Sequence, residues 1–141
     1  MATSTATAFR AALISALQGR SSLTGVQIGY GMPAGSLLRE HMLLGAVGGN
    51  QEFRAIGAQH KFEEYEQTVH IGVIREGQQQ QTCDERAFTL MAELEDTLMD
   101  DLTVGNTVMT AELSGFNLEP LAAETTREAR LTVTVTVKAR I

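Results

Sequence analysis

The C-terminal thirteen residues alternate strictly between apolar and polar side chains, and this pattern constrains the fold more than any other. The odd positions hold Ala129, Leu131, Val133, Val135, Val137, Ala139 and Ile141. The even positions hold Arg130, Thr132, Thr134, Thr136, Lys138 and Arg140. Successive side chains of a strand point to opposite faces, so the segment predicts a long strand with one buried and one polar face. Other elements must cover the buried face.

Two segments have the apolar spacing of helices that could provide this cover. The apolar residues of the first are Phe9, Ala12, Leu13, Ala16 and Leu17, and this helix should end near Gly19. The second begins with Thr82 and Glu85, which fit a T-x-x-E capping box. It continues with Ala87, Met91, Leu94 and Leu98. A turn at residues 104–106 should close it.

The remaining alternation predicts shorter strands. We expect them at residues 26–30, around 42–47, at 64–75 and at 108–113. Residues 48–50, Gly-Gly-Asn, should form a flexible break, and the charged stretch Gln51–Glu66 should begin as a long loop. The order predicts an α+β fold: an antiparallel or mixed β-sheet with two main helices packed on one face. A length of 141 residues favours one domain over residues 1–141.

Composition narrows the possible partners. The formal net charge is −6, which argues against a grip on nucleic acid but would suit a passage for DNA. No run of about 18 apolar residues occurs, so we expect no membrane span. The N-terminal segment lacks a basic region ahead of its apolar part, and we expect a helix there rather than a signal peptide. The protein should act inside a cell or be released by lysis.

Residue types that carry chemistry are present but scattered. His41, His60 and His70 lie far apart without a second ligand at metal spacing, and Cys83 is the only cysteine. We therefore expect no metal site. The glycine-rich stretches IGYGMPAG and LLGAVGGN do not match a phosphate loop, and we expect no cofactor.

Acidic residues gather in two places. Glu63, Glu64 and Glu66 could act as paired carboxylates, but Lys61 and Arg54 are nearby and no His or Ser adjoins them. Intersubunit ion pairs or a solvated face fit them better. The second helix carries its own acidic residues: Glu93, Glu95, Asp96, Asp100 and Asp101. A solvated helix face explains these.

Several motifs resemble those of the tail terminator proteins of long-tailed bacteriophages. The motifs are Leu44-Gly45-x-Val47, Gln51-Glu52-Phe53-x-Ala55-x-Gly57, Lys61-x-Glu63-Glu64-Tyr65 and Val69-x-Ile71-x-Val73. The second helix is similar too, from Cys83-Asp84-Glu85-Arg86-Ala87 to Leu94-Glu95-x-x-Leu98-x-x-Asp101. The resemblance covers roughly residues 8–113. Leu102 follows Asp101 where the family often has proline, which affects the expected turn.

This resemblance implies a structural virion protein without catalytic activity. It implies a homo-oligomeric ring, hexameric in the family, that caps the tail tube, ends its polymerisation and offers a surface to the head. The partners would be the tail tube protein and a head–tail connector protein, with DNA passing through the lumen without specific binding. The location would be the tail–neck junction of the virion, and the host cytoplasm during assembly. The residues expected to contact a neighbouring subunit or the tube are Gln51, Phe53, Arg54, Lys61, Glu63, Glu64 and Tyr65.

Three alternatives remain open from the sequence. The chain could be a head-completion or connector subunit on the head side of the neck. It could be a small α+β enzyme that uses Glu63 or Glu64 with His60 or His70. It could be a small-molecule-binding module with a site between sheet and helices. If Glu63 and Glu64 lie exposed at an interface, reversing both charges should leave the monomer folded and weaken assembly.

Overall fold

The computed structural model describes residues 3–53, 61–77 and 79–141. It contains two helices, a short 3₁₀ turn and five strands. In chain order they are α1 Ala6–Gln18, η1 Ser21–Leu23, β1 Gln27–Gly29, β2 Glu40–Phe53, β3 Lys61–Glu76, α2 Gln80–Asp100, β4 Thr110–Ala122 and β5 Thr126–Arg140. Among these residues, no helix is long and apolar enough to cross a bilayer.

The alternating C-terminal segment forms β5, as predicted, and lies inside the sheet. The strand order is β1-β2-β3-β5-β4, so β5 pairs with β3 on one side and β4 on the other. Its odd residues from Ala129 to Ala139 are buried, and its even residues face the opposite side. β1 runs parallel to β2, and the other pairs are antiparallel. The sheet is therefore mixed.

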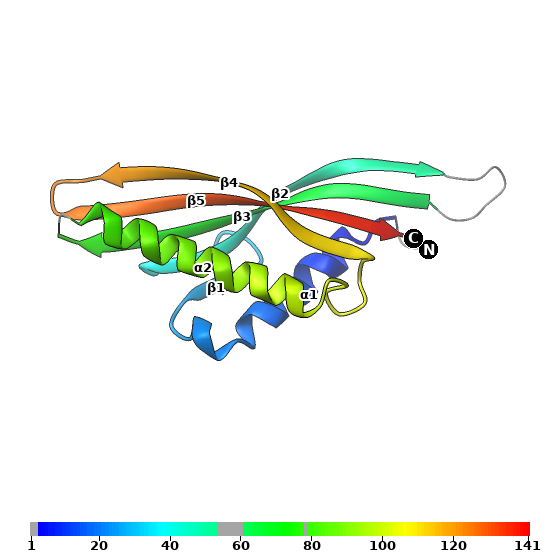
Figure 1. Ribbon diagram of the computed structural model, residues 1–141, viewed down its shortest axis with the longest axis horizontal. Coiled ribbons are helices and arrows are strands. Elements are labelled where there is room, and N and C mark those ends of the chain that lie inside the picture. The colour runs from blue at the N-terminus through cyan, green and yellow to red at the C-terminus, as the bar shows by residue number, and fades with distance from the viewer. Residues whose placement is uncertain (1–2, 54–60, 78) are drawn as a thin grey trace.

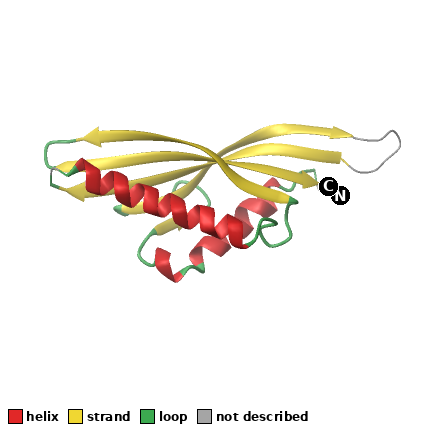
Figure 2. Ribbon diagram, in the orientation of Figure 1, coloured by secondary structure: helices red, strands yellow, loops and turns green. Residues whose placement is uncertain are grey.

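Both helices lie against one face of this sheet (Figures 1 and 2), which confirms the predicted α+β arrangement. α1 buries Phe9, Leu13 and Leu17, three of the residues that predicted it. α2 buries Ala87, Leu94 and Leu98 from the predicted stripe. These side chains pack on the odd residues of β3 and β5 in one core. The other face of the sheet is called the outer face below.

The structure corrects the middle of the chain. β2 runs on through the expected break, where Gly49 pairs with Tyr65 and Asn50 pairs with Glu64. Its last residue, Phe53, pairs with Lys61. The expected loop Gln51–Glu66 is thus wrong at both ends, and residues 54–60 lie outside the described residues. Pairing with β3 satisfies the backbone groups of this stretch, and this overrides the weak strand preference of its glycines.

The expected capping box at the start of α2 is also wrong. The helix begins at Gln80, and its N-cap residue Gln79 makes no side-chain capping bond. Thr82 donates a hydrogen bond to Oε1 of Gln79 at 3.1 Å, whereas Glu85 accepts one from Gln81 at 2.8 Å. The side chains that matched the motif therefore have other partners. The closing turn after α2 lies where it was predicted, with positive φ at Val104, Gly105 and Asn106.

Candidate functional site

The described residues among those expected at an interface lie at one end of the sheet, on two neighbouring strands. We call Val47–Phe53 of β2 and Lys61–Gln67 of β3 the distal hairpin (Figure 1). Gln51 and Phe53 lie on the first strand, and the Phe53 side chain is 69% exposed. Lys61, Glu63, Glu64 and Tyr65 lie on the second. Arg54 lies outside the described residues.

The alternation of β3 separates the two adjacent glutamates. Glu64 points to the outer face and is exposed. Glu63 points to the helix side and is only 5% exposed, so the exposure expected for it is wrong. Its Oε1 accepts hydrogen bonds from the backbone N–H of Thr5 at 2.7 Å and from the Thr5 hydroxyl at 2.5 Å. The Ser4 hydroxyl donates to the same oxygen at 3.2 Å. Glu63 therefore anchors the start of α1.

These contacts, together with burial, shift the pKa values of Glu63 and Tyr65. Burial by itself would raise the pKa of Glu63, but the hydrogen bonds from Thr5, Gln51 and Ser4 outweigh it and hold the pKa below its usual value. Burial raises the pKa of Tyr65 to about 12, and the Glu63 charge adds to that rise. The Tyr65 oxygen lies 3.1 Å from the Thr5 hydroxyl oxygen. Because the Thr5 hydroxyl donates to Glu63, Tyr65 is the donor in this contact.

Gln51 and Lys61 of the distal hairpin extend the hydrogen-bond network around Glu63. The Gln51 amide donates to Oε2 of Glu63 and to the carbonyl of Thr3, both at 2.8 Å. The Lys61 ammonium donates to Oε1 of Gln51 at 3.1 Å. The structure thus brings together Gln51, Lys61, Glu63 and Tyr65, but it does so within one chain. Their contact with a second subunit stays a prediction.

A second polar cluster, which the sequence did not indicate, lies at a register shift in β2. The β2–β3 register shifts between Leu44 and Val47. Arg10 of α1 donates from Nη1 to the Gly45 carbonyl at 2.7 Å and to Oε1 of Gln67 at 2.9 Å. The Gln67 amide, which is fully buried, donates to the Gly45 carbonyl as well. An isolated Gln in an alternating strand carries no signal of this role, because its partners are backbone atoms of a bulge.

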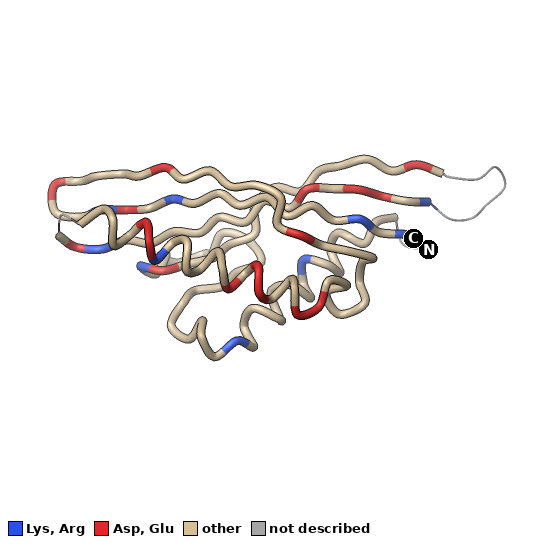
Figure 3. The backbone as a smooth tube through the Cα atoms, in the orientation of Figure 1, with Lys and Arg blue, Asp and Glu red and all other residues tan. Residues whose placement is uncertain are grey.

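The outer face is largely polar, and neither helix covers it. Thr68, Thr132, Thr134 and Thr136 form its centre. The acidic residues Glu64 and Glu66 lie toward the hairpin (Figure 3), with Lys138 paired beside Glu64. A hollow of about 780 Å³ crosses this end, lined by hairpin residues and by Met109, Lys138 and Ala139.

The described groups with catalytic potential do not converge on one site. His70 lies exposed on the outer face, opposite to Glu63, and His60 lies outside the described residues. The Cys83 thiol is fully buried, and this burial raises its pKa. Within residues 3–53, 61–77 and 79–141, no group of three or more His, Cys, Asp or Glu side chains is arranged to hold a metal ion.

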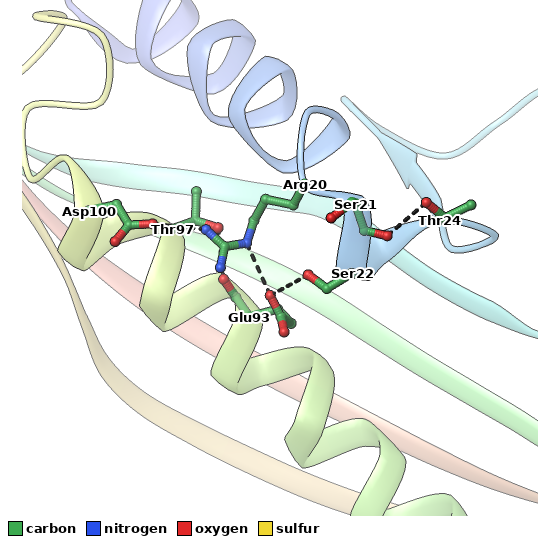
Figure 4. Close-up of polar contacts among 7 residues, drawn as sticks. All are labelled: Arg20, Ser21, Ser22, Thr24, Glu93, Thr97 and Asp100. Carbon is green, nitrogen blue, oxygen red and sulfur yellow. Dashed lines mark hydrogen bonds and ion pairs between the residues drawn. The ribbon is translucent and has the colours of Figure 1, made fainter.

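Two ion-pair clusters tie the helices to the rest of the chain. Arg20 contacts Glu93 and Asp100 of α2, each at 3.0 Å, and the Ser22 hydroxyl donates to Glu93 (Figure 4). These hydrogen bonds lower the pKa of Glu93. The acidic face of α2 is thus partly paired, not only solvated.

The second cluster lies at the other end of α2. Glu40 accepts from Arg86 at 2.9 and 3.0 Å, one bond on each oxygen, and from Arg75 at 2.6 Å. The hydrogen bonds from Arg86 lower the pKa of Glu40. These contacts hold α2 against the start of β2 and the end of β3.

Comparison with known proteins identifies the fold. No family model and no curated protein sequence matches this chain. Solved structures do match, among them a chain of the structure described as "Virion of native gene transfer agent (GTA) particle". The TM-score is 0.55 at 12% sequence identity, and the match covers 98% of this chain and 100% of that chain. The two chains therefore share a fold over their full lengths.

Proposed function

We propose that this chain is a structural virion protein, and that within the particle it acts as a tail terminator. The observation that supports a virion role most directly is the fold shared with a chain of a gene transfer agent virion, end to end in both chains. The assignment to the tail terminators rests on the sequence motifs between residues 44 and 101, which resemble that family. The two observations are of different kinds, because one concerns backbone shape and the other residue patterns.

In this role the chain would form a closed ring, hexameric as in the family it resembles. The ring would cap the last ring of tail-tube subunits, stop their polymerisation and present a surface to the head. A cyclic ring needs two different, complementary surfaces on each subunit. The distal hairpin, the outer face and the exposed Phe53 are available for such contacts.

The proposed role is structural rather than catalytic. The carboxylates with clearly lowered pKa values have structural partners: Glu63 binds the start of α1, Glu40 binds Arg86, Glu93 binds Ser22 and Arg20, and Asp101 binds its own turn. Side chains held in this way stabilise the fold and leave little capacity for proton transfer. The net charge of −6 fits a ring through which DNA passes without being held.

Electron microscopy of particles made without this gene tests the proposal. Overlong, irregular tubes without attached heads are the expected result, because nothing would end tube growth. A plasmid copy of the wild-type gene should restore normal length. Tails of normal length beside heads that leak DNA would move the chain to the head side of the neck. Intact, infectious virions would contradict both virion roles.

A second test uses purified components. Tube protein polymerising in vitro should give shorter tubes as this protein is added, because each cap removes one growing end. Tube lengths independent of the added protein would contradict the terminator role.

A further inference from the structure

The second half of β2 is exposed in a way that the rest of the sheet is not. The strand buries His41, Met42, Leu43 and Leu44, and then leaves all eight residues of Ala46–Phe53 exposed. β1 pairs with His41–Leu43 only. Within the part of the chain that the structure describes, Val47–Asn50 therefore pairs with β3 alone, and its other edge carries no strand.

This edge lacks the features that protect free edges in monomeric proteins. Exposed edge strands are usually short or interrupted by Lys, Pro or a bulge, because a bare edge invites another strand. The stretch Val47–Asn50, VGGN, contains no charged residue and no Pro, and the register shift of β2 lies before it. Gly48 and Gly49 carry no side chain that would hold a second backbone away. Glycine also favours strands weakly, so a further strand beside this one would stabilise it.

The opposite edge of the sheet offers a matching strand. β4 pairs with β5 only, a bulge interrupts it between Leu113 and Gly115, and Pro120 removes one N–H further along. The regular stretch Thr110–Leu113 remains. It lies level with the distal hairpin, because Asn50 pairs with Glu64, Glu64 with Lys138, and Lys138 with Thr110 across the sheet.

The strand directions agree as well. Three successive antiparallel pairings connect β2 to β4, so these two strands run in opposite directions. A second copy that continues the sheet would therefore place its β4 antiparallel to the β2 of the first. Antiparallel pairing is the slightly more stable kind.

We propose that Val47–Asn50 of one copy pairs with Thr110–Leu113 of the next, with Asn50 opposite Thr110, so that the sheet continues from subunit to subunit. The contact joins two different edges, so it repeats around a ring without two-fold symmetry. Each subunit completes the unpaired edge of its neighbour. This inference rests on the ring of the proposed function, and it assigns which strands form that ring.

Cysteine cross-linking tests the pairing. The variant Asn50→Cys/Thr110→Cys places both thiols on the outer face, one on each edge strand and level with each other. Three strand spacings of about 4.8 Å separate the two positions within one chain, roughly 14 Å, which no disulfide can span. A bond must therefore join two copies. Asn50→Cys/Arg130→Cys is the matched control, because Arg130 is exposed on the same face but lies on the inner strand β5. Cys83 is buried and stays in place.

The expected result is a ladder of cross-linked species, sensitive to reductant, that ends at the ring size for the first pair and is absent for the control. Equal cross-linking by both pairs, or none at the highest soluble concentration, would overturn the proposal. Dimers from the single variant Asn50→Cys would overturn it too, because they would show two β2 edges paired about a two-fold axis.

Amide hydrogen exchange gives a second measurement that needs no substitution. Pairing of these edges should slow exchange in residues 47–50 and 110–113 of the assembled protein relative to the dilute protein, with α2 unchanged. A ring without this protection overturns the strand pairing but leaves the terminator role intact. If the cysteine pair cross-links into a ring but tubes made without the gene have normal lengths, the strand pairing stands and the terminator role is contradicted.

Discussion

Glu63 of β3 accepts two hydrogen bonds from Thr5, one from its backbone N–H at 2.7 Å and one from its hydroxyl at 2.5 Å. The two residues are 58 positions apart in sequence. A carboxylate beside the N-terminal end of a helix also interacts favourably with the helix dipole. This contact joins the first helix to the distal hairpin, and it means that the adjacent residues Glu63 and Glu64 have different roles.

Substitution of each glutamate alone should separate these roles. Glu63→Gln removes a buried charge that several donors share, and should lower the free energy of unfolding by about 1–3 kcal/mol. Glu64→Gln, at an exposed position, should stay within about 0.5 kcal/mol of wild type. Urea unfolding measures both. Equal effects of the two substitutions would refute the anchoring role of Glu63.

The anchor should also make stability depend on pH. The folded state lowers the pKa of Glu63, so its contribution is complete above the usual value of 4.5 and is lost as pH falls through the lowered pKa. The free energy of unfolding of the wild type should therefore decline in acid more steeply than that of Glu63→Gln. Glu40, whose pKa is also lowered, should leave part of the slope in the variant. Parallel acid profiles for the two proteins would argue against this linkage.

The two neighbouring glycines of β2 should respond differently to alanine. A Cβ at Gly49 would collide with the backbone of Glu64 and Tyr65, whereas a Cβ at Gly48 meets nothing. Gly49→Ala should cost about 1–3 kcal/mol of unfolding free energy, the usual cost of overpacking. Gly48→Ala should change it by less than about 0.5 kcal/mol. Thermal unfolding of both variants gives the comparison, and a well-tolerated Gly49→Ala would contradict the close approach of the two strands.

Two ion pairs near the end of β3 should differ in strength. Glu40 has a 17% exposed side chain and binds Arg86 through both oxygens, whereas Arg39 and Glu76 are 58% and 74% exposed. A double-mutant cycle of Glu40→Gln and Arg86→Met should give a coupling energy of about 1 kcal/mol or more. The cycle of Arg39→Met and Glu76→Gln should give less than about 0.5 kcal/mol, as solvated pairs do. Similar coupling energies in the two cycles would count against the shielding of Glu40.

Regular periodicity made much of the fold predictable. β5 and the two helices each bury a single stripe, and a stripe is visible in sequence. β4 was predicted only to residue 113, because its bulge shifts the alternation by one position, so that Phe116 and Leu118 pair opposite the buried Val133 and Leu131. A two-residue period cannot be followed across such a shift. The strand at Gly48–Phe53 was missed for another reason, since glycines signal a break wherever pairing does not override them.

The candidate site was predictable as a location but not as a set of contacts. The described parts of the charged stretch, Gln51–Phe53 and Lys61–Glu66, do lie together at one end of the sheet. Local sequence could not show that Glu63 faces inward, because its partner Thr5 lies in another element. The same limit applies to Gln67, whose buried amide binds backbone carbonyls at a bulge that no residue pattern announces.

Both ends of the described chain meet the distal hairpin. The Thr3 carbonyl accepts a hydrogen bond from Gln51, and the backbone N–H of Ile141 donates to the carbonyl of Lys61. An affinity tag or fluorescent fusion at either end would therefore lie at the end of the sheet that carries the proposed contact, and could block assembly without disturbing the fold. The turn between β4 and β5, at Ala123–Thr125, lies at the opposite end of the sheet (Figure 1). An epitope inserted there would report on the particle while leaving the hairpin clear.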